Sequence, residues 1–252
     1  MMDLSMLVSV YQDKFESIYP YQLRIDMSLE FPMINEGNFL IPPDESAIIE
    51  IERLLTKNEP KLALAKWNQH YFVEQNFVLD TVLLGIYQQI NDFENALKIK
   101  IHWQKTMDKL VEIKGIQFYK ALHFLYLGNI LYKMNEFEAA SNYFQKATIR
   151  FRGLFSDNEF IGSRYCQFLI IQSYNALGAR GEARYHIREI IEKFDLSKDE
   201  KVNYSWQLYK SYQFSNNRLK TEEYAEKLKI MLSQISDHQY DHFSKLLLED
   251  NL

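Results

Sequence analysis

The hydrophobic residues of the stretch 121–147 recur at the three- and four-residue spacing of amphipathic helices. The spacing predicts two helices that meet at a polar turn over residues 134–136. Small side chains at Gly128 and Ala140 would let the two helices approach closely, and the ring of Phe144 would fill the space that remains between them. We therefore predict a helical hairpin here.

The same pattern returns along most of the chain. Alanines mark the start of the second helix in successive predicted hairpins, and the matching positions are Ala63, Ala96, Ala140, Ala183 and Ala225. The intervals between them are 33, 44, 43 and 42 residues. We predict five hairpins in which the extra residues lengthen the second helix and the loop that follows it, as in residues 149–162.

The two ends of the chain depart from this pattern. Residues 1–43 fit no repeat, and we predict that they form an N-terminal helix and an irregular arm. The predicted repeat domain covers residues 44–252. Apolar residues four apart favour a helix between Leu4 and Ile18, and Asp44 is expected to cap the first helix of the repeat domain. Apolar residues at 243–248 are expected either to cap the last hairpin or to form half of a dimer contact.

Composition supports an all-α chain, since 8 Gly and 5 Pro in 252 residues are too few for many β-hairpins. The net charge of −5 and the dispersed basic residues argue against direct nucleic-acid binding. The single cysteine, Cys166, excludes an intramolecular disulfide and suits a reducing compartment. No apolar stretch reaches about 18 residues, and the N-terminus lacks the basic start of a signal peptide. We expect a cytoplasmic protein without membrane contact.

The sequence holds little that indicates chemistry. The glycine-rich phosphate-binding patterns and the GxSxG pattern of acyl transfer do not occur. His238 and His242 are four residues apart and could face one way on a helix, but no third metal ligand stands near them. His70, His102, His123 and His186 are single residues that we expect to pack or to face solvent. The sequence thus predicts no cofactor, no metal site and no enzyme.

The stretch 121–147 resembles a tetratricopeptide repeat, with Gly128, Ala140, Phe144 and Ala147 at signature positions. The resemblance implies a right-handed superhelix of helical hairpins. Repeats longer than 40 residues with aromatic-rich helices are also similar to the sensor domains of bacterial peptide-pheromone receptors of the Rgg, PlcR and Rap type. Those receptors work in quorum sensing and transcriptional regulation, but this chain has no helix-turn-helix segment.

In such a superhelix the first helix of each hairpin lines the concave side, so its outward positions would form a groove. Amide side chains can bind the main chain of an extended peptide, and aromatic rings can accept its side chains. The predicted peptide-binding residues are Thr81, Gln88, Gln89, Leu125, Asn129, Tyr132, Lys133, Tyr165, Phe168, Gln172 and Asn175. The resemblance implies that Asn129 and Asn175 hold the peptide main chain.

Two hypotheses follow from the sequence. The first is a cytoplasmic sensor that binds a short linear peptide in the groove and acts through protein contacts, as a homodimer. The second is a structural adaptor that joins two proteins without a small peptide ligand.

Overall fold

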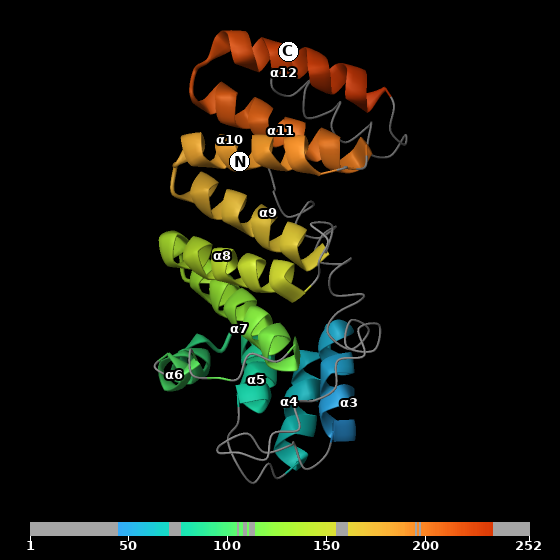
Figure 1. Ribbon diagram of the computed structural model, residues 1–252, viewed down its shortest axis with the longest axis vertical. Coiled ribbons are helices and arrows are strands. Elements are labelled where there is room, and N and C mark those ends of the chain that lie inside the picture. The colour runs from blue at the N-terminus through green and yellow to red at the C-terminus, as the bar shows by residue number, and fades with distance from the viewer. Residues whose placement is uncertain are drawn as a thin grey trace. The chain divides into compact units, whose positions relative to one another are not determined.

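A computed structural model describes residues 45–70, 77–104, 106–107, 110, 114–154, 161–194, 196 and 198–233 (Figure 1). These residues form ten α-helices and no strand, which confirms the predicted all-α class. The helices are α3 (Glu45–Thr56), α4 (Pro60–Gln69), α5 (Phe77–Ile90), α6 (Phe93–Trp103), α7 (Lys114–Lys133), α8 (Phe137–Leu154), α9 (Ile161–Ala176), α10 (Arg180–Lys193), α11 (Lys198–Phe214) and α12 (Arg218–Leu232). Among the described residues, no helix is both long and apolar enough to span a bilayer.

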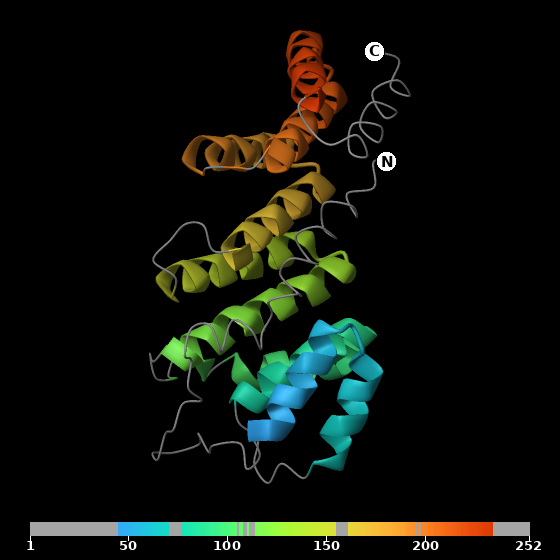
Figure 2. The ribbon, with the colours of Figure 1, turned by 90° about the vertical axis from the view of Figure 1, so that its right-hand side faces the viewer.

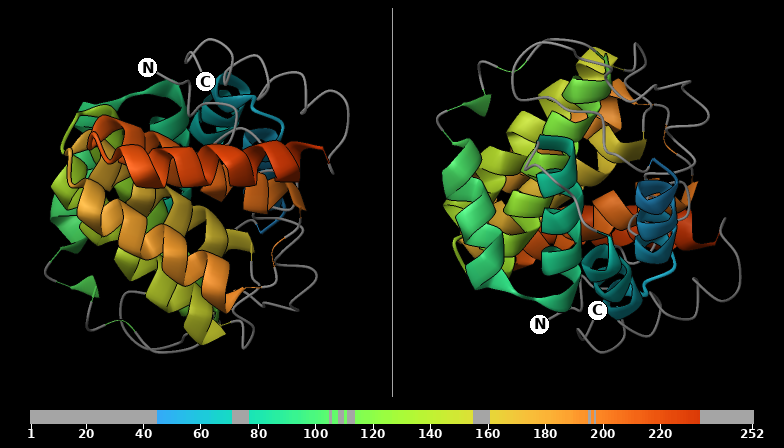
Figure 3. Two further views of the ribbon diagram at one scale, coloured as in Figure 1. Left: turned by 90° about the horizontal axis from the view of Figure 1, so that it is seen from above. Right: turned by 90° about the horizontal axis from the view of Figure 1, so that it is seen from below.

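The chain divides into two compact units, Met1–Ser173 and Tyr174–Leu252. In the first unit α3 packs on α4, α5 on α6 and α7 on α8, and in the second α11 packs on α12. Figure 2 shows α7 and α8 as two long helices side by side, and Figure 3 shows α12, in red, against α11. The boundary predicted after residue 43 lies outside the described residues, as do the predicted N-terminal helix, the Asp44 cap and the C-terminal cap.

The two helices of each predicted hairpin are joined by the same kind of short turn. One residue in each turn has a positive φ, and these residues are Asn58, Asn91, Asn135, Gly178 and Asn216, with φ between 52° and 74°. Asparagine and glycine tolerate this left-handed conformation better than other residues. The sequence therefore ends each first helix at a defined position.

The residue after each left-handed position belongs to both helices. Its N–H donates to the carbonyl five residues back, as Glu136 does to Leu131 at 2.9 Å. Its own carbonyl accepts the first hydrogen bond of the next helix, as Glu136 does from Ala140 N–H, also at 2.9 Å. In two of the turns this residue is also a side-chain cap, because Asp92 accepts from Asn95 N–H and Asn217 accepts from Lys220 N–H, both at 3.2 Å.

The turns correct the register of the fifth predicted hairpin. Thr221 N–H donates to Asn217 O, as Ala140 N–H donates to Glu136 O. Thr221, and not Ala225, therefore matches Ala140. Ala225 lies one turn further along α12 and is buried there. The interval to this hairpin is consequently 38 residues.

The long repeats come from both helices of a hairpin. The α7 and α8 helices have 20 and 18 residues, whereas α5 and α6 have 14 and 11. The expectation that the extra residues lengthen the second helix and the loop after it agrees with the long α8, but it missed the long first helix α7. A longer α7 is favourable because it is buried on nearly all sides between Ile116 and Leu131, where it packs against α5, α6 and α8.

Two glycines allow this close packing. A Cβ atom at Gly128 would lie 2.4 Å from the ring of Phe144, which confirms the predicted contact between α7 and α8. A Cβ atom at Gly85 would lie 2.9 Å from the ring of Tyr126, so α5 approaches α7 in a similar way. On two sides, helix α7 thus makes close contacts that are possible only because a glycine, with no side chain, stands there.

Candidate functional site

The structure sorts the predicted peptide-binding residues into a buried group and an accessible group. The buried group is Thr81, Leu125, Tyr165, Phe168 and Gln172. The prediction that these side chains point outward is wrong. For Thr81 and Leu125 the reason is that α5 packs on α7, so positions that a lone hairpin would expose are covered by the neighbouring helix.

Six predicted residues remain at least partly accessible. They are Gln88, Gln89, Asn129, Tyr132, Lys133 and Asn175. The first five belong to α5 and α7 in the first unit, whereas Asn175 belongs to the second unit. The accessible residues of α5 and α7 cluster near the C-terminal ends of these helices, close to the turns that follow them.

Lys133 joins the ends of α5 and α7. Its Nζ donates to the side-chain oxygen of Asn91 at 2.7 Å and to the carbonyl of Gln88 at 3.2 Å. Asn129 lies one helical turn before Lys133 on the same side of α7. We call Gln88, Asn91, Asn129 and Lys133 the α5–α7 amide strip.

Two amides of this strip are free to bind a ligand. The side chains of Gln88 and Asn129 are half-buried, and neither has a hydrogen-bond partner within the described ranges. Each amide offers two N–H donors and one oxygen acceptor. Because both helices are fixed by packing and by Lys133, the two amides stand on rigid supports.

The remaining accessible residues of α5 and α7 have structural partners. Gln89 Nε2 donates to the carbonyl of Leu55 at 3.2 Å, so this side chain ties α5 to the end of α3. The ring of Tyr132 packs edge-on against Phe137, with centroids 5.1 Å apart. Burial raises the pKa of Tyr132, so its hydroxyl keeps its proton near neutral pH. Gln89 and Tyr132 therefore contribute mainly to the packing around the turns.

A layer of buried polar groups lies inside the first unit. Trp103 Nε1 donates to Asp80 Oδ2 at 2.7 Å, which joins the end of α6 to the start of α5. Tyr119 donates its hydroxyl hydrogen to Glu52 at 2.9 Å, which joins α7 to α3. Hydrophobic periodicity gave no sign of these pairs, because Asp80 and Glu52 are charged residues at buried positions.

His123 is buried in the same layer. Thr81 Oγ1 donates to the carbonyl of Phe77 at 2.8 Å and lies 3.1 Å from His123 Nδ1. Since the hydroxyl has only one hydrogen, His123 Nδ1 carries the proton and donates to Thr81. The other ring nitrogen, Nε2, is buried and has no partner within the described part of the chain.

Burial shifts the proton equilibria of this layer. It lowers the pKa of His123 from 6.5 to about 3, so the imidazole is neutral. It also raises the pKa of Asp80 above 3.8, although the hydrogen bond from Trp103 opposes that shift. Both shifts disfavour the charged form, as expected where water is excluded.

Part of this polar layer lines a narrow cleft between α3, α5 and α7. Its walls include Glu52, Thr81, Tyr119 and Tyr126, and it has no room for a water molecule. This cleft is too narrow to admit a substrate. We therefore interpret the buried layer as a device that fixes how the helices pack.

No cluster of three or more metal-ligating side chains occurs in the ranges that the structure describes. His238 and His242, the candidate metal pair of the sequence, lie outside these ranges. Of the other histidines, His123 is buried and His186 is half-buried. The ring of His186 stacks on that of Tyr174, with centroids 5.4 Å apart. These two positions agree with packing roles.

Comparison with known proteins finds no matching family model, no matching curated protein and no matching solved structure.

Proposed function

We propose that this chain is a binding module, and not an enzyme, and that it holds a short linear peptide against the α5–α7 amide strip. In this proposal the hairpins stack as in tetratricopeptide repeats, with the strip on the concave side. Peptide binding would then be passed on through contacts with a protein partner, as in a cytoplasmic sensor.

The observation that supports this function is the pair of unpartnered amides at Gln88 and Asn129, among the residues that the structure describes. A peptide main chain presents both N–H and C=O groups, and an amide side chain can serve both. Because the helix backbone under each amide is already fixed, only the side chain loses conformational freedom when it binds. Neighbouring Lys133 adds a positive charge that suits the C-terminal carboxylate of a short peptide.

The proposal can be tested although the natural peptide is unidentified. Linear peptides displayed as a random library would be selected on the wild-type protein, and the recovered peptides would be titrated by calorimetry. A net hydrogen bond contributes about 0.5–1.5 kcal/mol. Asn129→Ala and Gln88→Ala should therefore each weaken binding by about 2- to 12-fold.

A matched control is available on α8. Asn142 is an exposed amide on the second helix of the same hairpin. Asn142→Ala should leave peptide affinity unchanged. If all three variants bind the selected peptides as tightly as the wild-type protein does, the α5–α7 amide strip is not the binding surface.

A second candidate function is that of an adaptor which contacts proteins through its second helices. Ile101 on α6 and Ile149 on α8 are 69% and 67% exposed, so both large apolar side chains are available for a protein contact. One use of such a surface is homodimerisation, for which light scattering would give a mass near twice 30.1 kDa. Ile149→Glu should then return the mass to that of a monomer, while leaving peptide binding at Asn129 intact.

A further inference from the structure

Three arginines form a row along α10. Arg180, Arg184 and Arg188 are spaced four residues apart, which places them on one side of the helix. With a rise of about 1.5 Å per residue, neighbouring arginines start about 6 Å apart along the helix axis. We call these residues the α10 arginine row.

The last turn of α11 holds two of these side chains in place. Arg180 Nη1 donates to the carbonyl of Phe214 at 2.8 Å, and its guanidinium lies 4.9 Å from the centre of the Phe214 ring. Arg184 Nη1 lies 3.1 Å from Ser211 Oγ and 3.0 Å from Ser215 Oγ, and it donates to both. The carbonyls at a helix C-terminus carry partial negative charge, which favours cations there.

The third arginine is held by its own helix. Arg188 Nε donates to the carbonyl of Arg184 at 3.3 Å. All of the acceptors that the three guanidiniums contact, within the described ranges, are uncharged. Each guanidinium has five N–H groups, so several remain for a further ligand on each side chain.

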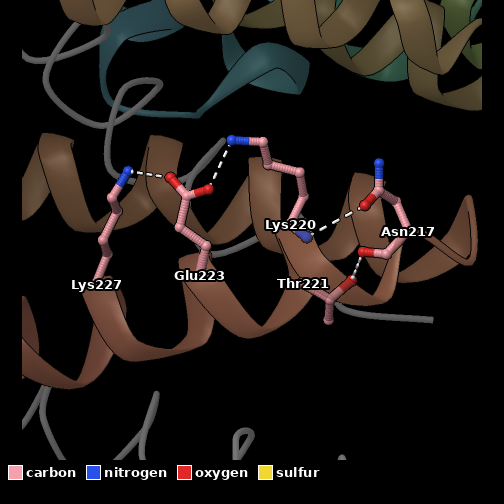
Figure 4. A network of polar contacts seen from close by, with 5 residues as sticks. All are labelled: Asn217, Lys220, Thr221, Glu223 and Lys227. Carbon is pink, nitrogen blue, oxygen red and sulfur yellow. Dashed lines mark hydrogen bonds and ion pairs between the residues drawn. The ribbon is translucent and has the colours of Figure 1, made fainter.

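Ion pairs elsewhere in the second unit contrast with this row. On α12, Lys220 and Lys227 both contact Glu223 at 2.6 and 2.7 Å (Figure 4). Arg218 contacts Glu222 at 2.7 Å on the same helix. The α10 arginine row has no carboxylate within ion-pair distance among the described residues, although Glu182 and Glu189 lie on the same helix.

We propose that the α10 arginine row is a docking site for an extended acidic segment of a partner protein. The supporting arguments are charge complementarity and spacing. Alternate residues of an extended chain are about 6.6 Å apart, which is close to the spacing of about 6 Å along α10. Carboxylates on every second residue can therefore meet consecutive guanidiniums, and an arginine can bind a carboxylate through two parallel N–H groups.

An acidic polypeptide fits this surface better than a nucleic acid does. The chain as a whole carries a net charge of −5, and the row itself holds only the three arginines. Nucleic-acid affinity depends on neutralising many phosphates. The inference goes beyond peptide binding at Asn129, because it concerns a different surface in the other compact unit.

The test uses the full chain and a fluorescein-labelled peptide in which glutamate and threonine alternate over about ten residues, long enough to span the row. Binding is followed by fluorescence anisotropy at low salt, where exposed charges are least screened. An exposed ion pair contributes about 0.2–1 kcal/mol, so Arg188→Gln should weaken binding by up to about fivefold. Arg180→Gln and Arg184→Gln should have effects of similar size, and the triple variant a larger one.

Arg218→Gln is the matched control, because it removes the same charge from an arginine that already has a carboxylate partner. This control should keep wild-type affinity. Circular dichroism checks that each variant folds, and Arg188→Gln is the most informative one because the hydrogen bond that holds Arg188 lies within its own helix. A larger salt dependence for the wild-type protein than for the triple variant is also expected.

Several results would overturn the proposal. One is equal weakening by Arg218→Gln and Arg188→Gln, since the attraction would then depend on net charge alone. Another is equally tight binding of a peptide with glutamine in place of glutamate, or of one with its glutamates in a single block. Tighter binding of a single-stranded oligonucleotide, or no binding of the acidic peptide at millimolar concentration, would also refute it.

Discussion

Replacing Gly128 with alanine tests whether the close contact between α7 and α8 holds the first unit together. The new Cβ atom would lie 2.4 Å from the Phe144 ring, whereas carbon atoms prefer a separation of about 3.5–4.0 Å. The ring is fully buried and would have to move by about 1 Å. Overpacking of this kind costs about 1–3 kcal/mol, and the short distance places Gly128→Ala in the upper part of that range.

A second effect acts in the opposite direction. Alanine is favoured over glycine in a helix by about 1 kcal/mol. The net result for Gly128→Ala should therefore be a loss of about 2 kcal/mol in the free energy of unfolding. Urea unfolding followed by circular dichroism measures this loss as a lower midpoint with an unchanged slope.

Gly153→Ala provides the matched control in the same hairpin. Gly153 lies in α8, and an added Cβ atom would meet nothing within 4 Å. This variant should be more stable than the wild-type protein by up to about 1 kcal/mol, because only the helix preference changes. The two alanine variants should thus differ by about 3 kcal/mol.

A double variant tests whether the loss of stability in Gly128→Ala comes from the contact with Phe144. Phe144→Leu should cost less stability in the Gly128→Ala background than in the wild-type protein, because a smaller side chain relieves the contact. Residues in contact typically show coupling of about 0.5–3 kcal/mol. If Gly128→Ala proves as stable as Gly153→Ala, or if the coupling is zero, then Gly128 does not set the distance between these helices.

Further predictions concern the turns and the buried groups. Asn135 has a φ of 65°, so Asn135→Ala should cost about 1–2 kcal/mol and Asn135→Gly much less, as measured by urea unfolding. Burial raises the pKa of Asp80 above 3.8, so the folded state holds this proton better than the unfolded chain does. The free energy of unfolding should therefore fall as pH rises from 3.8 through the folded pKa. Asp80→Asn should lose this dependence in urea midpoints measured from about pH 3.5 to 7. Burial lowers the pKa of His123 from 6.5 to about 3, so on acidification the imidazole of the unfolded chain is protonated first. The free energy of unfolding should therefore fall as pH drops from 6.5 towards 3. His123→Leu should stay folded at lower pH than the wild-type protein, as seen by circular dichroism. Burial also raises the pKa of the Cys166 thiol, so a thiol-reactive dye should label it only as fast as the protein opens, and rapid labelling of the folded protein would contradict its burial.

Local chemistry made part of the fold predictable. The helix pair around residues 134–136 follows from apolar spacing and from an asparagine that accepts a positive φ. The contact between Gly128 and Phe144 follows from a small residue opposite a large one. These features depend on residues that are close together in the chain or lie in one hairpin, so they can be predicted from the residue pattern of that hairpin.

The errors arose where distant helices decide the outcome. Thr81 and Leu125 occupy outward positions on a single hairpin, but packing of α5 on α7 covers them. His123 is polar and buried, and its hydrogen-bond partner Thr81 lies 42 residues earlier in the chain. Spacing along one helix contains no information about such partners.

One error could have been avoided from the sequence. Matching Ala225 to Ala140 relied on residue type, whereas the turn geometry is set by Asn216 and the cap at Asn217. Placing the asparagine turn first would have put Thr221 in that position. The sequence also shows the four-residue spacing of the α10 arginine row. It does not show that these arginines lack carboxylate partners among the described residues.

The shared residue in each turn limits how the chain can change in length. Glu136 completes the hydrogen bonds of α7 and also begins those of α8, so an insertion of one residue between them would turn α8 by about 100° about its axis. Its buried side, including Phe144, would then face solvent. The turns inside the hairpins should consequently tolerate no inserted residue, which makes them unsuitable places for attaching a reporter or splitting the protein into fragments.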